Sequence, residues 1–253
     1  MVWGVVLAYF CLSGRIIAYL HPAFHVYTAI SAGVLLLLAV VLLLTVGGES
    51  AVSKGASLSK QVFASLILVG PLLAATGISP SEFGAAAVEN RGLVEHISDL
   101  PAFTVPTEPA LPTADGSIGP ETPIDAASYL KRTETGKIKA ETVDLLYAAA
   151  EPTMREDFEN KDVELIGQFL PMRSGNPTGD RFNLVRMFVM CCAADARPVA
   201  VAVQTGDGAT FPDMTWVKIS GRATFPIESG RRSALIVADS IQEIDAPPET
   251  FIY

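Results

Sequence analysis

Two adjacent cysteines and an aspartate, Cys191, Cys192 and Asp195, are the side chains of this chain best suited to chemistry. They follow an apolar stretch typical of a strand, and the only other cysteine, Cys11, lies far away in the sequence. Thiolates and carboxylates bind soft or borderline divalent metals such as zinc. The pattern therefore predicts a metal site made by these three residues, with a fourth ligand from elsewhere.

The spacing sets a condition on that site. Successive side chains of a strand point to opposite faces, so Cys191 and Cys192 share a ligand only if the strand ends at Cys191 and the chain turns. Residues 193–196 permit the turn, and Pro198 closes it. Two alternatives stay open: both cysteines are small core residues with Asp195 capping the turn, or they do thiol redox chemistry as a vicinal disulfide, which an oxidising compartment would favour.

The front of the chain is apolar and the back is acidic. The formal net charge is −9, yet residues 1–81 contain only four charged side chains. Segments at about 2–20, 26–47 and 61–80 are each long enough to cross a bilayer, which takes about 20 apolar residues. We expect a three-helix transmembrane domain over 1–81, which makes this a multi-pass protein of the cell inner membrane.

The orientation in the membrane follows from few basic residues. Lys54 and Lys60 lie in the loop between the second and third predicted helices, and Arg15 and Arg91 would lie on the opposite side. We expect the N-terminus inside, because the two lysines lie in a true loop, whereas Arg15 can extend from a helix end towards the interface. Three crossings then place the soluble part outside the cytoplasm.

A juxtamembrane segment and linker over 82–125 separate the apolar front from a soluble domain over 126–253. Six prolines between positions 98 and 125 predict an extended tether. The soluble domain begins with a helix over 142–150, and Pro152 starts another helical turn. Patterns typical of strands follow at 163–172, 181–192, 199–204, 216–225 and 234–244, with Gly221 as a bulge or bend. Five strands predict an OB-like β-barrel; a small sandwich is the alternative.

Several motifs occur together in the order of one known family. They are the stretches 163–169, 185–198 with Cys-Cys-Ala-Ala-Asp-Ala, 216–221 and 247–253, and the first-helix residues Ser13-Gly14-Arg15 followed by Tyr19-Leu20-His21-Pro22. In these the chain resembles the YcgQ-like family, the smaller subunit of a two-component bacterial permease. The resemblance implies membrane helices, a soluble C-terminal domain, a larger polytopic permease subunit as partner, and a role in metal handling. Some relatives carry a His-rich loop between the second and third helices, but residues 47–60 here contain no histidine.

Arg15 and His21 are candidate residues for contact with a partner or a transport path. Arg15 is the one charge in the first predicted span, where a charge is costly; it either extends to the interface or pairs with an acid of a partner subunit. His21 and His25 flank the exit of that span, either at the membrane interface or facing a transport path.

Composition and motifs exclude several classes of protein. An acidic domain with few aromatic residues does not fit a nucleic-acid groove. The sequence contains no nucleophile elbow, phosphate loop or metalloprotease helix, and no histidine after His96 to serve a hydrolase. We expect a non-enzymatic accessory subunit of a two-component permease whose soluble domain binds a substrate, a partner, or zinc or another divalent metal. The alternative is a stand-alone membrane-anchored thiol-redox or metal-binding protein.

Overall fold

The computed structural model describes residues 2–46, 63, 67, 69–70, 83–100, 130–206, 208–228 and 230–253. The described chain forms two compact units. The first comprises the described part of Met1–Phe83 together with Val189–Ala196 and Tyr253, and the second comprises Gly84–Phe188 and Arg197–Ile252. A short loop of the C-terminal half therefore belongs to the N-terminal unit.

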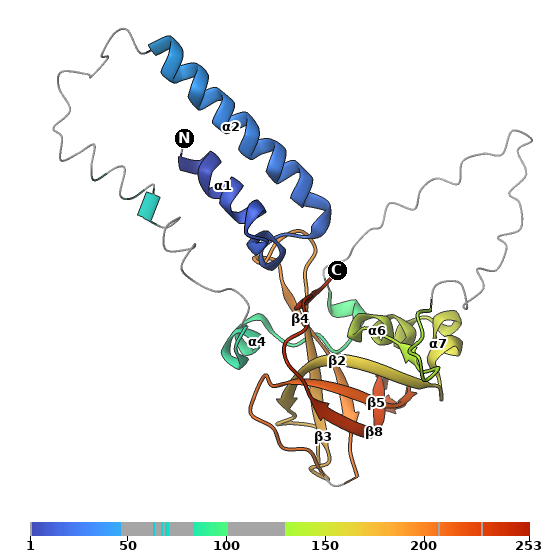
Figure 1. The fold of residues 1–253 in the computed structure, drawn as a ribbon. Helices are drawn as coiled ribbons and strands as arrows, with labels where there is room; N and C mark the ends of the chain where they lie inside the picture. Colours follow the sequence, from blue (N-terminus) through green and yellow to red (C-terminus); the bar gives the residue numbers. More distant parts are fainter. Residues whose placement is uncertain are drawn as a thin grey trace, which may run out of the picture. The chain divides into compact units, whose positions relative to one another are not determined.

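Two apolar helices dominate the first unit and lie side by side (Figure 1). In chain order its helices are α1 (Val2–Leu12), the 3-10 helices η1 (Arg15–Ala18) and η2 (Pro22–Phe24), and α2 (His25–Val46). The two long helices approach closely at Gly4, where a Cβ atom would lie 3.0 Å from the Leu36 side chain. A larger residue at this contact would require Leu36 to shift by a few tenths of an ångström.

The first predicted span, 2–20, is wrong as one continuous helix. The α-helix ends at Leu12, because Gly14 adopts a φ of 72°, the left-handed conformation that commonly ends helices. The chain then continues as a 3-10 helix. Eleven residues of α-helix extend only about 16 Å, roughly half of the hydrocarbon thickness of a bilayer.

In the described part of the chain, one helix is long and apolar enough to cross a membrane, rather than the predicted three. It covers Pro22–Thr45, 24 residues that match the predicted second span. His21 caps its start, because the Nδ1 atom of its ring accepts a hydrogen bond from the Ala23 amide at 3.1 Å. The third predicted span, 61–80, lies outside the described residues except at positions 63, 67, 69 and 70.

The second unit contains a closed five-stranded β-barrel preceded by helices, as the sequence predicts (Figure 1). The long strands are β2 (Asp162–Pro171), β3 (Arg181–Phe188), β4 (Arg197–Gln204), β5 (Trp216–Thr224) and β8 (Leu235–Glu243). They pair in the order β2-β3-β4-β8-β5 and back to β2, antiparallel throughout except between β4 and β8. The short strands are β1 (Ile138–Lys139) beside β2, β9 (Phe251–Ile252) beside β3, and the hairpin of β6 (Ile227–Glu228) and β7 (Arg231–Arg232).

Two glycines allow the sheet to close. Strand β2 pairs with β5 and then with β3, and at Gly167 a Cβ atom would lie 2.7 Å from the Leu184 side chain. At Gly221 the register between β5 and β8 shifts, which confirms the predicted bulge. A Cβ atom there would lie 2.2 Å from the Val237 carbonyl oxygen, so no side chain fits.

Helices and a loop segment pack against the barrel. Helices α6 (Thr142–Ala150) and α7 (Pro152–Phe158) lie where the sequence predicts them, and they bury Leu145 and Phe158 in the core. Helix α4 (Ala85–Arg91) and the 3-10 helix η3 (Ile97–Asp99) precede them. Between these two, the Val94 amide donates to the Pro198 carbonyl at 2.8 Å. Residues 84–100 therefore pack with the barrel, whereas 101–129, most of the predicted linker, lie outside the described residues.

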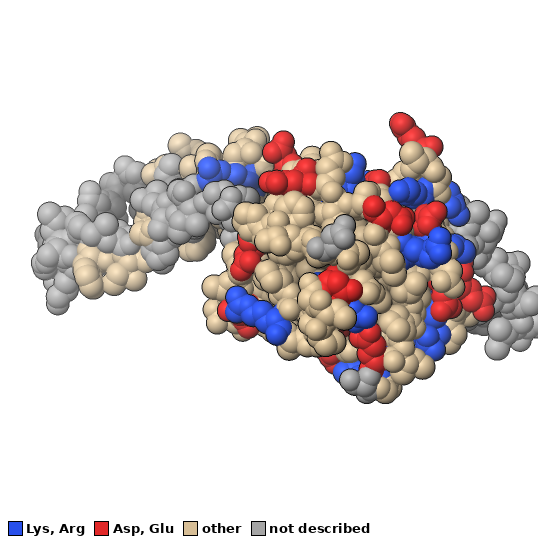
Figure 2. Space-filling view, turned by 90° about the horizontal axis from the view of Figure 1, so that it is seen from below, with Lys and Arg blue, Asp and Glu red and all other residues tan. Residues whose placement is uncertain are grey.

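Charged side chains of both signs are mixed on the face of the molecule that Figure 2 displays. The second unit forms three ion pairs among the described residues: Arg173–Glu89 at 2.8 Å, Arg181–Glu228 at 2.9 Å and Arg231–Asp99 at 3.4 Å. No continuous basic stripe crosses the face shown in Figure 2. The exclusion of nucleic acid stays a prediction from composition.

Gly221 gives a direct test of barrel closure. We expect Gly221→Ala to lower the free energy of unfolding by about 1–3 kcal/mol, because the new methyl group overlaps a backbone carbonyl that cannot move freely. Gly206→Ala, in open space, should change it by less than about 0.5 kcal/mol. Denaturant unfolding of the full chain in detergent measures both. Equal stability of the two variants would contradict the close approach of β5 and β8.

A candidate metal centre at the β3–β4 loop

The candidate site is the loop Val189–Ala196, which joins β3 to β4. The Asp195 carboxylate organises it by accepting three consecutive backbone amides. Oδ1 accepts from Met190 at 3.0 Å, and Oδ2 accepts from Cys191 at 2.8 Å and Cys192 at 3.2 Å. Amides turned towards a carboxylate cannot also join a sheet. Strand β3 therefore ends at Phe188, and the prediction that it continues to residue 192 is wrong.

The strand ends before Cys191 and the chain turns, which is the condition under which both cysteines can bind one metal ion. The two Sγ atoms lie 3.7 Å apart, within the range of a sulfur hydrogen bond. One ligand atom each from Cys191, Cys192 and Asp195 lies within 4.8 Å of the others. Cys191 is exposed and Cys192 is half-buried, so the pair is open to solvent on one side and is not part of a hydrophobic core.

The same loop is held by the segment that follows η1. The His21 amide donates to the Cys191 carbonyl at 3.0 Å, and the Ala193 amide donates to the Tyr19 carbonyl at 2.8 Å. These two bonds form an antiparallel bridge between Leu20 and Cys192. The Tyr253 ring packs edge-on against the His21 ring, with centroids 4.7 Å apart. The backbone of the cysteine pair is therefore fixed from both sides, by Asp195 and by the exit of the first helix.

Comparison with protein families matches two regions of the chain. Residues 1–94 match the DUF1980 N-terminal domain, and residues 132–253 match the DUF1980 C-terminal domain. The chain carries both DUF1980 domains. Comparison with curated proteins found no match.

The hydrogen bonds between residues 19–21 and the cysteine loop thus join the two DUF1980 domains. Tyr19 and His21 belong to the N-terminal match, and Cys191 and Ala193 belong to the C-terminal match. Residues 95–131, between the two matches, contain most of the predicted linker. In the structure, the cysteine loop of the C-terminal DUF1980 domain packs in one compact unit with the N-terminal DUF1980 domain.

The electrostatics of the loop favour an ionised Asp195 and a protonated Cys191. Burial acts to raise the pKa of Asp195, but hydrogen bonds from the Cys191 thiol and from the three amides outweigh it and lower the pKa below 3.8. The hydrogen bond to Asp195 is the largest cause that raises the pKa of Cys191, from 9.0 to about 12, and the neighbouring Cys192 sulfur adds to it. Without a metal ion, the exposed thiol in the DUF1980 loop is therefore a weak nucleophile.

Arg15 and His21, the two residues predicted to contact a partner or a transport path, lie in different surroundings. Arg15 belongs to η1, and its guanidinium lies 5.9 Å from the centroid of the Tyr9 ring. His21 lies beside the cysteine loop through its amide, but its ring nitrogen Nδ1 caps η2. Among the described residues, the cluster of potential metal ligands contains Cys191, Cys192 and Asp195 and not His21.

Sequence reasoning missed two parts of this site. The backbone groups of Tyr19 and His21 hold the loop, and backbone contacts leave no residue pattern in a sequence. The packing of Tyr253 on His21 joins residues 232 positions apart, a separation that no periodicity reveals. The aromatic character of the last residues was the only available signal.

The reactivity of Cys191 tests the hydrogen bond to Asp195. At pH 8 a thiol with a pKa of about 12 is ionised in only about one molecule in ten thousand. In metal-free full-length protein we expect iodoacetamide to modify Cys191 at least about tenfold more slowly than it modifies glutathione. Asp195→Asn should accelerate the reaction, because the neutral amide no longer disfavours the thiolate.

The control is Asp239→Asn, which changes an exposed aspartate on β8. Mass spectrometry of the modified peptides measures the rate at each cysteine. A Cys191 that reacts as fast as glutathione, with no effect of Asp195→Asn, would contradict the described geometry.

Proposed function

We propose that this protein binds a borderline divalent metal ion such as zinc through the Cys191 and Cys192 thiolates and Asp195. The observation that carries the proposal is the gathering of three suitable donor atoms within 4.8 Å in a preorganised, solvent-open turn. A preorganised loop loses little conformational freedom when it takes up an ion, so the donor set favours binding.

The distance between the sulfurs supports a tetrahedral ion. Two sulfurs bound to one zinc at about 2.3 Å with a tetrahedral angle lie about 3.8 Å apart. The Sγ atoms of Cys191 and Cys192 are 3.7 Å apart without an ion. Linear coordination would instead need sulfurs about 4.6 Å apart at the same bond length. The pair therefore needs little movement to bind a tetrahedral ion.

Asp195 has capacity for one further partner. An ionised carboxylate offers about four lone-pair sites, and backbone amides occupy three of them here. Loss of the thiol proton on metal binding removes the competing hydrogen bond from Cys191. Three protein ligands leave at least one position of a tetrahedral ion open to water, to a partner side chain or to a ligand carried by the ion.

We further propose that the chain is a non-enzymatic accessory subunit of a membrane permease. Helix α2 provides one membrane crossing, and its large apolar side chains are mostly exposed, as expected for a helix that faces lipid or a partner. The resemblance to the YcgQ-like family supports a larger polytopic subunit as that partner. The hydrogen bonds between residues 19–21 and the cysteine loop would place the metal close to the membrane segment. The side of the membrane and the third span at 61–80 stay predictions.

The soluble domain fits this role through its fold. The strand order, with β4 and β8 parallel, supports an OB-like barrel, a fold that commonly serves as a binding module.

A vicinal disulfide is a less favourable alternative to metal binding for the two cysteines. Adjacent Cα atoms are about 3.8 Å apart across a trans peptide, closer than the usual range of about 4.4–6.8 Å for disulfides.

Metal content tests the site directly. We expect about one zinc ion per chain in full-length protein purified in mild detergent with reductant, and none in the Cys191→Ser, Cys192→Ser double variant. Cys11→Ser is the matched control and should retain the metal, because Cys11 lies in α1 outside the ligand cluster. Elemental analysis of all three proteins measures the content. Equal metal in all three, or none in the parent, would refute the site.

Association with a partner tests the accessory role. We expect the tagged full-length chain, extracted from its native membranes in mild detergent, to purify in a fixed ratio with the polytopic protein encoded beside it. Size-exclusion chromatography with light scattering measures the mass of the complex, and a tagged unrelated membrane protein is the control. A chain that elutes alone as a stable monomer under these conditions would contradict the role.

A further inference from the structure

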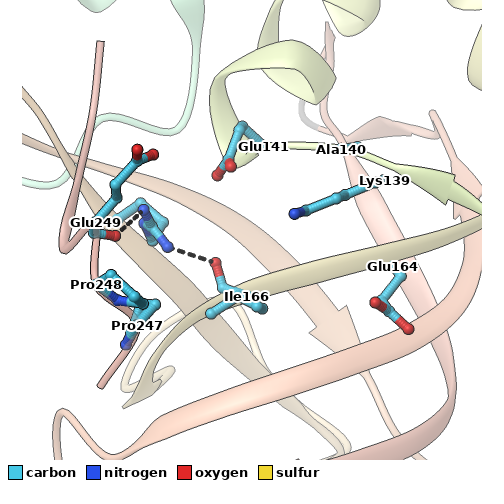
Figure 3. Close-up of a pocket in the computed structure, with 9 residues that line it drawn as sticks. Lys139, Ala140, Glu141, Glu164, Ile166, Pro247, Pro248 and Glu249 are labelled. Atoms are coloured by element: carbon cyan, nitrogen blue, oxygen red, sulfur yellow. Dashed lines mark hydrogen bonds between the residues drawn. The ribbon is translucent and has the colours of Figure 1, made fainter. Parts of the chain in front are cut away.

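One cavity of the barrel unit is lined by charges that already act on one another. Figure 3 shows the Lys139 amine and the Glu141 carboxylate directed into this cavity, whose volume is about 390 Å³. Burial is the largest cause that raises the pKa of Glu141, and the charges of Arg186 and Lys139 act in the opposite direction. These charges therefore select no ligand by themselves.

A second cavity of the same unit, which we call the outer cavity, lies against β3 and β4 and has a volume of about 210 Å³. Phe182 and Leu184 on β3 belong to the hydrophobic core. Because successive side chains of a strand point to opposite faces, Asn183 between them points outwards. Asn183 and Ala202, its partner on β4, both line the cavity. The outer cavity is therefore a feature of the outer face of the barrel.

The outer cavity lies where OB-folds bind their ligands. Besides β3 and β4, its lining includes the loop between β2 and β3 and the segment between β5 and β8. In the OB-like barrel that we propose for this unit, these are the second and third strands and the loops L12 and L45. This face of an OB-fold binds oligonucleotides and oligosaccharides. The fold thus favours a ligand in the outer cavity.

The Asn183 side chain points to a ligand most directly. The residue is 6% exposed, and its side-chain amide forms no hydrogen bond with any other residue that the structure describes. Buried amides are normally hydrogen-bonded, and an unpaired one costs free energy. An amide offers an acceptor oxygen and an NH₂ donor side by side. Asn183 therefore favours a ligand that donates and accepts at neighbouring positions.

The walls of the outer cavity are held in place by side-chain contacts. The guanidinium of Arg181 on β3 pairs with Glu228 on β6 at 2.9 Å. Asn176 holds the loop between β2 and β3, because its Nδ2 donates to the Arg181 carbonyl at 2.8 Å and its Oδ1 accepts the Arg181 amide at 3.2 Å. A preformed site of this kind loses little conformational entropy when it binds a ligand.

The remaining polar groups select a neutral ligand rich in hydroxyl groups. Glu95 lines the cavity and forms no ion pair in the described part of the chain, so its charge disfavours phosphates and carboxylates. Nucleic acid is a polyanion and is disfavoured for the same reason. Ser174 and Ser233 also line the cavity, and a hydroxyl both donates and accepts. A simple ammonium ion would satisfy Glu95 but offers no acceptor to Asn183.

We propose that the outer cavity binds one ring of a neutral saccharide or cyclic polyol. Two neighbouring hydroxyls of the ring pair with Asn183, one donating to Oδ1 and the other accepting from Nδ2. A further hydroxyl donates to Glu95, and the small side chain of Ala202 leaves room for the ring. The site is separate from the cysteine loop and goes beyond the proposed metal binding and accessory role.

Isothermal calorimetry of the full-length protein tests the binding of five probes: glucose, galactose, mannose, ribose and myo-inositol. The protein is kept in a detergent without a sugar headgroup and in a buffer without glycerol, because both would compete for the site. We expect at least one probe to bind with a Kd below about 1 mM, an affinity within the usual range for small ligands.

Substitutions locate the site. Asn183→Leu keeps the approximate size of the side chain and removes the donor and the acceptor, so it should weaken binding at least about tenfold. The same variant should melt at the temperature of the parent or higher, because it removes an unpaired buried amide. Ala202→Val should also weaken binding at least about tenfold, because it narrows the cavity without changing a polar group.

Gln242→Leu is the matched control, because it removes an exposed amide on β8, outside the lining of the outer cavity. It should bind the sugar as the parent does. The Cys191→Ser, Cys192→Ser double variant should do so too, which separates this site from the metal centre.

Three outcomes would overturn the proposal. None of the five probes binds at concentrations up to about 10 mM, a limit that excludes all but very weak sites. Asn183→Leu and Ala202→Val bind as the parent does, which places the sugar elsewhere on the protein. Inorganic phosphate or glycylglycine binds through Asn183 in place of the sugars, which assigns the cavity to another class of ligand.

Discussion

The Asp195 carboxylate, with three consecutive backbone amides pointing at it, is the interaction on which the rest of the candidate site depends. It ends β3 at Phe188 and turns the chain so that two neighbouring thiols lie 3.7 Å apart. It also leaves the Cys191 carbonyl and the Ala193 amide free to bond with residues 19–21. Charge-assisted hydrogen bonds of this kind are stronger than neutral ones, so this one side chain contributes most of the interactions that form the turn.

The barrel gives this turn its anchors. Strands β3 and β4 pair along their full lengths, from Arg181 with Gln204 to Phe188 with Arg197, so both ends of the loop leave from one rigid hairpin. Closure of the barrel depends on close backbone approaches at Gly167 and Gly221. The packing of the loop in one unit with the apolar helices brings the candidate ligands of the C-terminal DUF1980 domain beside the N-terminal one.

Much of the barrel could be predicted from the sequence, because alternation of apolar residues is a local property. The helices at Thr142–Ala150 and Pro152–Phe158 and the bulge at Gly221 follow from spacing and from glycine, and the structure confirms them. The break after Leu12 depends on the conformation of one glycine within an apolar run, and hydropathy does not detect it. The early end of β3 depends on backbone amides that donate to the carboxylate of Asp195, seven residues beyond Phe188, and strand propensity does not include this interaction.

The candidate metal site was predictable as a set of residue types but not as a geometry. Adjacent cysteines followed by an aspartate indicated donors, whereas the sulfur separation and the amide contacts of Asp195 appear only in the folded loop. The cavity lined by Lys139, Glu141 and Arg186 was not predictable, because these are ordinary charged residues until the fold brings them together.

X-ray absorption spectroscopy at the zinc edge of the loaded full-length protein tests the central claim most directly. The account predicts two sulfur neighbours at about 2.3 Å and lighter oxygen or nitrogen neighbours at about 2.0–2.2 Å, in a four-coordinate shell. A shell of oxygen and nitrogen alone, with no sulfur, would contradict it, because the metal would then lie away from Cys191 and Cys192.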